Sequence, residues 1–240
     1  MDNKAGLIFH IIHGSFVDGY GIRTTVFMKG CPLRCVWCCN PEGQECHPEI
    51  KFIPSDCDGC GRCVSVCPTN AIRIDAEIRG SIPDIRRELC TNCGNCIEVC
   101  YTGALSWVGR YITVQELFDT VQKDEQFYRT SGGGVTIGGG EPLSQPEFLR
   151  AFIKKCKDNY LHVAIDTCGY TTDDDARRIM EKADLLLFDL KCMDTNKHLE
   201  FTKAPNGIIL DNLRRLDAIG KPIIIRIPII PNNITHIALV

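Results

Sequence analysis

The sequence lacks the features of a secreted, membrane-bound or nucleic-acid-binding protein. Residues 1–6 contain no basic stretch followed by a long apolar run, so no signal peptide is predicted. The most apolar stretch, residues 223–230, is interrupted by Arg226 and Pro228 and is too short to span a membrane. Lysine and arginine total 27 against 30 acidic residues, which leaves no basic excess for nucleic acid. We therefore expect a cytoplasmic protein without membrane or nucleic-acid partners.

Cysteine, by contrast, is abundant, with 16 residues in a chain of 240. Dense disulfides belong to small secreted domains that cannot build a core, and this chain is long enough to build one. Clustered cysteines in a reducing cytoplasm indicate metal binding instead. Eleven of the sixteen fall into three spaced groups.

The second and third groups form an internal repeat with a shift of 33 residues. Each has the C-x2-C-x2-C-x3-C run of bacterial ferredoxins, in which the fourth cysteine binds the other cluster. The predicted ligands of one 4Fe–4S cluster are Cys57, Cys60, Cys63 and Cys100, and those of the second are Cys67, Cys90, Cys93 and Cys96. Structural zinc is the alternative, but zinc sites favour two C-x2-C pairs held apart by a longer loop.

The first group offers three thiolates, Cys31, Cys35 and Cys38, in a C-x3-C-x2-C pattern. Three cysteines would leave one iron of a 4Fe–4S cluster open to a ligand, as catalytic metal sites leave a position open. A zinc site that borrows Cys39 or His47 as its fourth ligand is the alternative. Cys39 directly follows Cys38, and neighbouring side chains rarely point at one metal, so we interpret Cys39 as a bystander close to the ligand.

Around these groups the pattern is that of an α/β fold. The predicted strands are 23–29, 134–137, 163–166, 185–190 and 222–230. Four helices are predicted. The first runs from a Thr113–Glu116 capping box to about residue 128, and the second is capped by Ser144 with Glu147. The third covers about 173–182, and the fourth covers about 208–219 and ends at Gly220. Strands that alternate with helices imply a parallel sheet, either open or curled into a barrel.

Polar residues follow the predicted strands where catalytic residues of parallel sheets gather. The first strand leads into the three-cysteine loop, and the next three lead into Gly138–Pro142, Asp166–Gly169 and Asp189-Leu190-Lys191. The fifth strand supplies Arg226 or the segment after it. No Lys-Ser or Lys-Thr follows the glycines, so they form no P-loop. Glycine there indicates a close approach of backbone to a ligand, and Glu141 suits an amino-acid ammonium group. A solvated loop edge is the alternative reading of Asp189 and Lys191.

Together these motifs resemble those of a known family. The three-cysteine loop with Trp37 and the Gly139-Gly140-Glu141-Pro142 segment resemble radical S-adenosylmethionine (SAM) enzymes. The segments 16–24, 131–136, 166–170 and 189–191 narrow the resemblance to the activating enzymes of glycyl radical enzymes. The two-cluster insert is similar to that of the members that act on lyases other than the pyruvate enzyme.

The resemblance implies a mechanism with three 4Fe–4S clusters and SAM as cofactors. Reduction of the three-cysteine cluster cleaves SAM, and the 5′-deoxyadenosyl radical takes a hydrogen from a glycine of a partner glycyl radical enzyme. No catalytic side chain is required beyond cluster and cofactor. Reduced flavodoxin or ferredoxin is the implied electron donor. The residues implied to bind SAM are Trp37, Cys38, Cys39, Gly139, Gly140, Glu141, Asp189, Leu190 and Lys191.

The implied fold is α/β, a partial parallel (β/α) barrel of the radical SAM type over residues 1–45 and 110–240. An α+β ferredoxin-like domain with two 4Fe–4S clusters is inserted at residues 46–109. The chain departs from the family at Tyr20, where proline is usual, at Gly138, where serine is usual, and at Lys203, where glycine is usual. The family continues past residue 240 with a sixth strand, so we expect a C-terminally short barrel. A weakly active electron-transfer protein, or a radical SAM enzyme with another substrate, is the alternative function.

Overall fold

The computed structural model describes residues 3–74 and 82–230. It divides the chain into two compact units, one of residues 1–47 and 111–240 and one of residues 48–110. The sequence predicted 46–109 for the inserted unit. Among the described residues, no helix has the length and apolar content that a membrane crossing requires.

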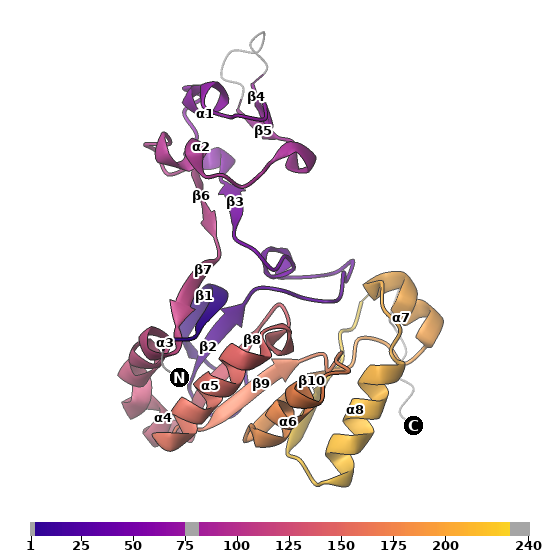
Figure 1. Cartoon of the computed structure of the whole chain (residues 1–240). Helices are drawn as coiled ribbons and strands as arrows, with labels where there is room; N and C mark the ends of the chain where they lie inside the picture. The colour runs from indigo at the N-terminus through magenta and orange to yellow at the C-terminus, as the bar shows by residue number, and fades with distance from the viewer. Residues whose placement is uncertain (1–2, 75–81, 231–240) are drawn as a thin grey trace. The chain divides into compact units, whose positions relative to one another are not determined.

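The first unit is built on a sheet that has seven strands among the described residues (Figure 1). Its order is β11-β10-β9-β8-β2-β1-β7. The strands are β1 (Ala5–Ser15), β2 (Arg23–Met28), β7 (Arg110–Thr113), β8 (Gly134–Gly139), β9 (Val163–Thr167), β10 (Leu185–Asp189) and β11 (Ile223–Arg226). Neighbours from β2 to β11 are parallel, as predicted, and β1 is antiparallel to β2. The sheet is therefore mixed.

Helices follow the parallel strands in the order that the sequence predicted. They are α3 (Val114–Val121), α4 (Glu125–Ser131), α5 (Pro146–Asp158), α6 (Asp174–Lys182), α7 (Thr195–Thr202) and α8 (Gly207–Ala218), with 3-10 turns η1 (Pro41–Gly43), η4 (Gln122–Asp124) and η5 (Pro142–Ser144). α5 packs against both α3 and α6 (Figure 1). α7 was not predicted from the sequence.

One predicted helix start is confirmed and another is wrong. Thr113 and Glu116 form the predicted capping box at the start of α3. The predicted Ser144 cap is absent, because Ser144 ends η5 and α5 begins at Pro146. Proline suits the first helical turn, where an N–H group would have no intrahelical partner.

The predicted strand 222–230 is too long. β11 ends at Arg226, two residues before Pro228, whose nitrogen cannot donate a hydrogen bond to a neighbouring strand.

Alternation along the strands separates an apolar face from a polar one. Val135 and Ile137 of β8, like Ile165 of β9, join the core that the helices cover. Their neighbour Thr136 lies on the opposite face, since successive side chains point to opposite sides. Asp166 and Asp189 share that opposite face with Ala164 and Leu187, which form a separate small cluster. The carboxylates at the strand ends thus point away from the helices.

The second unit consists of two short sheets and repeated turns. β3 (Glu49–Phe52) pairs with β6 (Leu105–Val108), and β4 (Ile72–Arg73) pairs with β5 (Asp84–Ile85). The turns are η2 (Pro54–Asp56), α1 (Arg62–Ser65), η3 (Arg87–Leu89) and α2 (Asn95–Glu98). The sequence shift of 33 residues carries η2 onto η3 and α1 onto α2. Both α1 and α2 begin after a left-handed glycine, Gly61 and Gly94.

Candidate functional site

A cavity of about 310 Å³ lies at the carboxyl ends of the parallel strands of the first unit. It brings together most of the residues that the sequence predicted for cofactor binding. Those that line it are Cys31, Cys35, Trp37, Cys38, Cys39, Gly139, Gly140, Asp189 and Lys191. Among the described residues, no three His, Cys, Asp or Glu side chains stand close enough to hold a single metal ion.

The three-cysteine loop leaves the end of β2 and is held from two sides. On one side the backbone N–H of Cys31 donates to Gln44 O at 3.0 Å. On the other, the N–H groups of Arg34 and Val36 donate to the carbonyls of Thr202 and Phe201 at 2.8 and 3.0 Å. These hydrogen bonds tie the loop to the last turn of α7, an element that sequence reasoning missed.

Glycine is required beside this loop because two backbones approach each other closely. Gly140 N donates to Met28 O at 2.8 Å, and the next residue's N–H donates to Gly30 O at 2.7 Å. A Cβ on Gly140 would lie 2.4 Å from Gly43 O and 2.5 Å from Gly30 O. The glycines therefore let β8 dock against the cysteine loop, and they also border the cavity.

Glu141 and Leu190 were predicted to bind the cofactor, and neither lines the cavity. Glu141 is 1% exposed, and its carboxylate accepts hydrogen bonds from Thr167 Oγ1 at 2.7 Å and Cys168 N at 2.8 Å. Burial raises the pKa of Glu141, while these donors oppose the rise. Leu190 belongs to the apolar core. In this structure Glu141 connects the turn after β8 to the end of β9.

Four charged side chains form a network at the cavity, one each from β9, β10 and β11 and one from the segment after β10. Arg226 donates from Nη2 to Asp166 Oδ1 at 2.5 Å and from Nε to Asp189 Oδ1 at 3.0 Å. Lys191 Nζ donates to the other oxygen of Asp189 at 2.6 Å. Register explains the pairing, because Arg226 lies directly opposite Asp189 across the β10–β11 ladder. The two carboxylates and two cations balance one another.

The surroundings shift the pKa values of Lys191 and Asp166, and in both cases burial and the neighbouring charges contribute. Burial lowers the pKa of Lys191, but the Asp189 carboxylate outweighs burial and the net shift is upward. Burial and the neighbouring Asp189 raise the pKa of Asp166 to about 7, and Arg226 opposes that rise. The cavity thus offers both carboxylates and cations to a ligand that carries charges of both signs.

Several lining residues were not among the predicted cofactor ligands. They are Phe27, Leu33, Asn40, Gln44, Asp166, Thr167, Cys168, Arg226, Pro228 and Ile230. Asp166 and Cys168 end or follow the predicted strand 163–166, and Arg226 is the charged residue within the predicted strand 222–230, which were the signals that could have included them. Asn40 and Gln44 come from the irregular loop around η1, where no periodic pattern marks a functional side chain.

In the second unit, the thiols of the ferredoxin-like repeat surround two small cavities. One is lined by Cys57, Cys60, Cys63 and Cys100, and the other by Cys67, Cys90, Cys93 and Cys96. Each set combines three cysteines of one run with the fourth cysteine of the other. Several thiols already accept backbone hydrogen bonds, such as Cys67 Sγ from Ala71 N at 3.2 Å.

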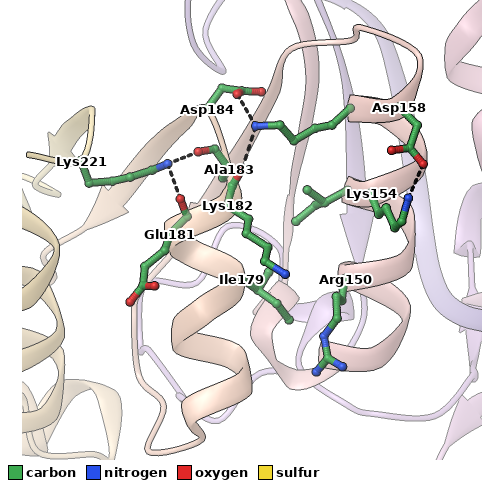
Figure 2. A pocket seen from close by; sticks show the side chains of 11 residues that line it. Arg150, Lys154, Asp158, Ile179, Glu181, Lys182, Ala183, Asp184 and Lys221 are labelled. Carbon is green, nitrogen blue, oxygen red and sulfur yellow. Dashed lines mark hydrogen bonds and ion pairs between the residues drawn. The ribbon is translucent and has the colours of Figure 1, made fainter. Parts of the chain in front are cut away.

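A larger cavity of about 680 Å³ lies at the opposite ends of the strands, between the ends of α5 and α6 (Figure 2). Lys157 Nζ pairs with Asp184 Oδ1 at 2.7 Å, and Lys154 Nζ pairs with Asp158 Oδ2 at 2.5 Å. Asp184 directly precedes β10, so this cavity borders the amino ends of the strands. Chemistry in parallel sheets gathers at the carboxyl ends, which favours the sulfur-lined cavity.

Comparison with known proteins shows the family to which the chain belongs. A sequence profile of the radical SAM superfamily matches residues 89–238, and a 4Fe-4S dicluster domain profile matches residues 56–104. The benzylsuccinate synthase activating enzyme of Thauera aromatica is 46% identical over 97% of this chain and 71% of its own length. The choline trimethylamine-lyase activating enzyme of Oleidesulfovibrio alaskensis is 42% identical over 96% of this chain and 74% of its own. The trans-4-hydroxy-L-proline dehydratase activating enzyme of Clostridioides difficile is 42% identical over 93% and 73%.

The superfamily match and the thiols at the strand ends define a radical SAM protein with an iron–sulfur insert. Within that class, the chain belongs to the family of glycyl-radical-enzyme activating enzymes. It is an oxidoreductase that cleaves SAM at a 4Fe–4S cluster and abstracts a hydrogen from a glycine of a partner enzyme. The predicted family and activity are confirmed.

Proposed function

We propose that this chain carries three 4Fe–4S clusters in a division of three, four and four cysteine ligands. Cys31, Cys35 and Cys38 would hold the cluster that supplies, when reduced, the electron that breaks the sulfonium C–S bond of SAM. The remaining two clusters would occupy residues 46–109, with the crossed ligand sets that the sequence predicted. The observation that carries this proposal is the gathering of each set of thiols around its own cavity.

SAM has a sulfonium, an ammonium and a carboxylate group, and the charges at the strand ends suit all three. Lys191 would pair with the carboxylate, while Asp189 and Asp166 would face the cationic groups. Trp37 would border the adenine, supported by Phe201, whose ring centroid lies 5.5 Å away. The backbone at Gly139 and Gly140 would bound the methionyl part. Arg226 would keep the two carboxylates from repelling each other.

The run of parallel strands from β2 to β11 would curve as a partial barrel around this site, with SAM at the carboxyl ends of the strands. We infer that the partner is a glycyl radical enzyme of the kind that the relatives' names describe, such as a synthase, lyase or dehydratase. Reduced flavodoxin or ferredoxin would supply the electrons. A reducing cytoplasm suits the many thiolate ligands.

Iron counting after anaerobic reconstitution tests the ligand sets. We expect about twelve irons per chain, and about eight in a Cys35→Ser variant that also stops releasing 5′-deoxyadenosine. Cys39→Ser is the matched control for iron content, because Cys39 lines the same cavity and is not assigned as an iron ligand. About four irons in the unaltered chain, or an equal iron loss in both variants, would overturn the assignment.

Equilibrium binding of SAM tests the charged network separately. Lys191→Gln removes the cation proposed for the methionyl carboxylate, so we expect affinity to fall about tenfold, as for one charge-assisted hydrogen bond. Lys182→Gln is the control, since Lys182 lines the cavity at the other ends of the strands (Figure 2). Unchanged affinity of Lys191→Gln for SAM would show that Lys191 does not bind the methionyl carboxylate.

A further inference from the structure

One of the two thiol cages of the second unit carries a group of three interacting side chains beside its cysteines. Asp58 follows Cys57, and Tyr101 follows Cys100. With Arg62, they line the cavity that Cys57, Cys60, Cys63 and Cys100 surround. The Tyr101 hydroxyl donates a hydrogen bond to Asp58 Oδ2. The Arg62 guanidinium carbon lies 4.9 Å from the centre of the Tyr101 ring, within the range of a cation–π contact.

These contacts join two segments that are distant in sequence. Asp58 and Arg62 stand in the loop that supplies three thiols of the cage, whereas Tyr101 stands beside the fourth thiol, 43 residues after Asp58. The fourth thiol is therefore tied to the other three by side chains as well as by the fold. Loss of a cluster requires ligands to move apart, and such a tie opposes that movement.

The internal repeat provides the comparison that isolates this feature. The shift of 33 residues carries Asp58 onto Thr91 and Arg62 onto Asn95, and it relates Tyr101 to Pro68. Proline has no hydroxyl to donate, and neither threonine nor asparagine carries a charge. Among residues 48–74 and 82–110, the equivalent hydrogen bond and cation–π contact are therefore missing at the second cage.

The two cages share two further features, although Arg86 Nη2 donates to Asn70 O at 2.8 Å only beside the second cage. Cys67 Sγ accepts from Ala71 N at 3.2 Å, and Cys100 Sγ accepts from Leu105 N at 3.3 Å. In each cage the third cysteine, Cys63 or Cys96, is buried. In the part of the chain that the structure describes, contacts between side chains that join two cysteine runs at a cage involve Asp58, Arg62 and Tyr101, which we call the clamp.

We propose that the clamp retains the cluster held by Cys57, Cys60, Cys63 and Cys100, and so makes the two ferredoxin-type clusters unequal in their resistance to loss. This inference rests on the ligand sets given under the proposed function. The clamp is a positioning device, since none of its side chains is a ligand. The cluster held by Cys67, Cys90, Cys93 and Cys96 is then the one lost first.

A chelator challenge of the full reconstituted chain tests the clamp. Under anoxia, a ferrous chelator and iodoacetamide are added together, and peptide mapping follows the alkylation of each cysteine over time. In the unaltered chain, we expect Cys67, Cys90, Cys93 and Cys96 to be alkylated before the clamped set. Tyr101→Phe keeps the ring but removes the hydroxyl, so we expect loss from the clamped set to become about three- to tenfold faster. Asp58→Ala should act in the same way.

Thr91→Ala, at the position related to Asp58 by the repeat, is the control and should leave both rates unchanged. Equal alkylation rates for the two sets in the unaltered chain would overturn the clamp, as would an unchanged rate in both Tyr101→Phe and Asp58→Ala. Iron is counted before the chelator is added. A shortage of iron at that stage would reject the ligand sets themselves, whereas full iron content with no difference between the sets would reject the clamp alone.

Discussion

At the scale of single residues, Arg23 is a fully buried cation that joins three segments of the first unit. Its guanidinium donates to Thr136 Oγ1 at 2.6 Å, to Val135 O at 2.8 Å and to Tyr20 O at 3.1 Å. Burial lowers the pKa of Arg23 to about 10, which leaves it charged at neutral pH. Arg23 lies in the segment whose resemblance to the family was noted from sequence, and in this structure its contacts are to the fold and not to the cavity.

We predict that Arg23→Leu lowers the free energy of unfolding by about 3 kcal/mol, because two buried acceptors and one partly buried acceptor lose their donor. Urea unfolding under anoxia measures the change. Arg129→Leu is the control: Arg129 pairs with Glu125, but its side chain is 79% exposed, so the change should stay below about 0.5 kcal/mol. Similar losses in both variants would contradict a special role for the buried arginine.

His162 lies beside Arg23, with Nδ1 3.3 Å from Arg23 Nη2. Burial and the Arg23 charge lower the pKa of His162 below its ordinary value of 6.5. On acidification the unfolded chain therefore binds this proton first, and stability falls as the pH drops below 6.5 toward the folded-state pKa. We predict that His162→Gln weakens this pH dependence, measured by urea unfolding at several pH values between 5 and 7.5. The exposed His47→Gln should leave the slope intact, and an equal change in both variants would count against the account.

At the scale of elements, the turn that ends α7 has an unusual residue in a left-handed conformation. Lys203 has φ of 64° at the C-cap of α7, a conformation that costs residues with a Cβ about 1 kcal/mol or more relative to glycine. We predict that Lys203→Gly raises the free energy of unfolding by about 1 kcal/mol. Lys197→Gly, within the same helix, should lower it by about 1 kcal/mol. Destabilisation by Lys203→Gly in urea unfolding would contradict this prediction.

The contact between β8 and the cysteine loop leads to a second prediction at this scale. Gly140→Ala would place a methyl group against two carbonyl oxygens, so the loop must move. We expect a loss of about four irons from the first cluster, with the insert clusters retained. Gly207→Ala is the control, because a Cβ at Gly207 meets nothing within 4 Å. Full iron content in Gly140→Ala would show that the loop tolerates the shift.

Local chemistry explains which elements the sequence predicts well. The Thr113–Glu116 box is a pattern with its own hydrogen bonds, and it forms as expected. The similar Ser144–Glu147 spacing does not cap a helix, because Pro146 fixes the helix start two residues later. β1 was not predicted, since its pairing with β2 has register irregularities that disturb the alternation of side chains. Its place depends on partners distant in sequence.

At the scale of the whole molecule, the parallel order of strands follows from the alternation of strands and helices. That order brings Asp166, Asp189 and Arg226 to one side of the sheet, and the sequence alone indicated where these side chains gather. Their pairing was not predictable, because it depends on the register between β10 and β11. That Glu141 does not line the cavity was likewise not predictable, since its direction results from the turn of the chain after Gly140.

The central claim is that this chain installs a radical on a glycine of a partner enzyme. Its most direct test incubates the reconstituted chain anaerobically with reductant, SAM and, in turn, each member of a broad panel of purified glycyl radical lyases. We predict a glycyl-radical doublet in the electron paramagnetic resonance spectrum of one partner, with an equal amount of 5′-deoxyadenosine, and neither product with Cys35→Ser. Cleavage of SAM without a radical on any of these lyases, or a radical formed by Cys35→Ser, would contradict the account.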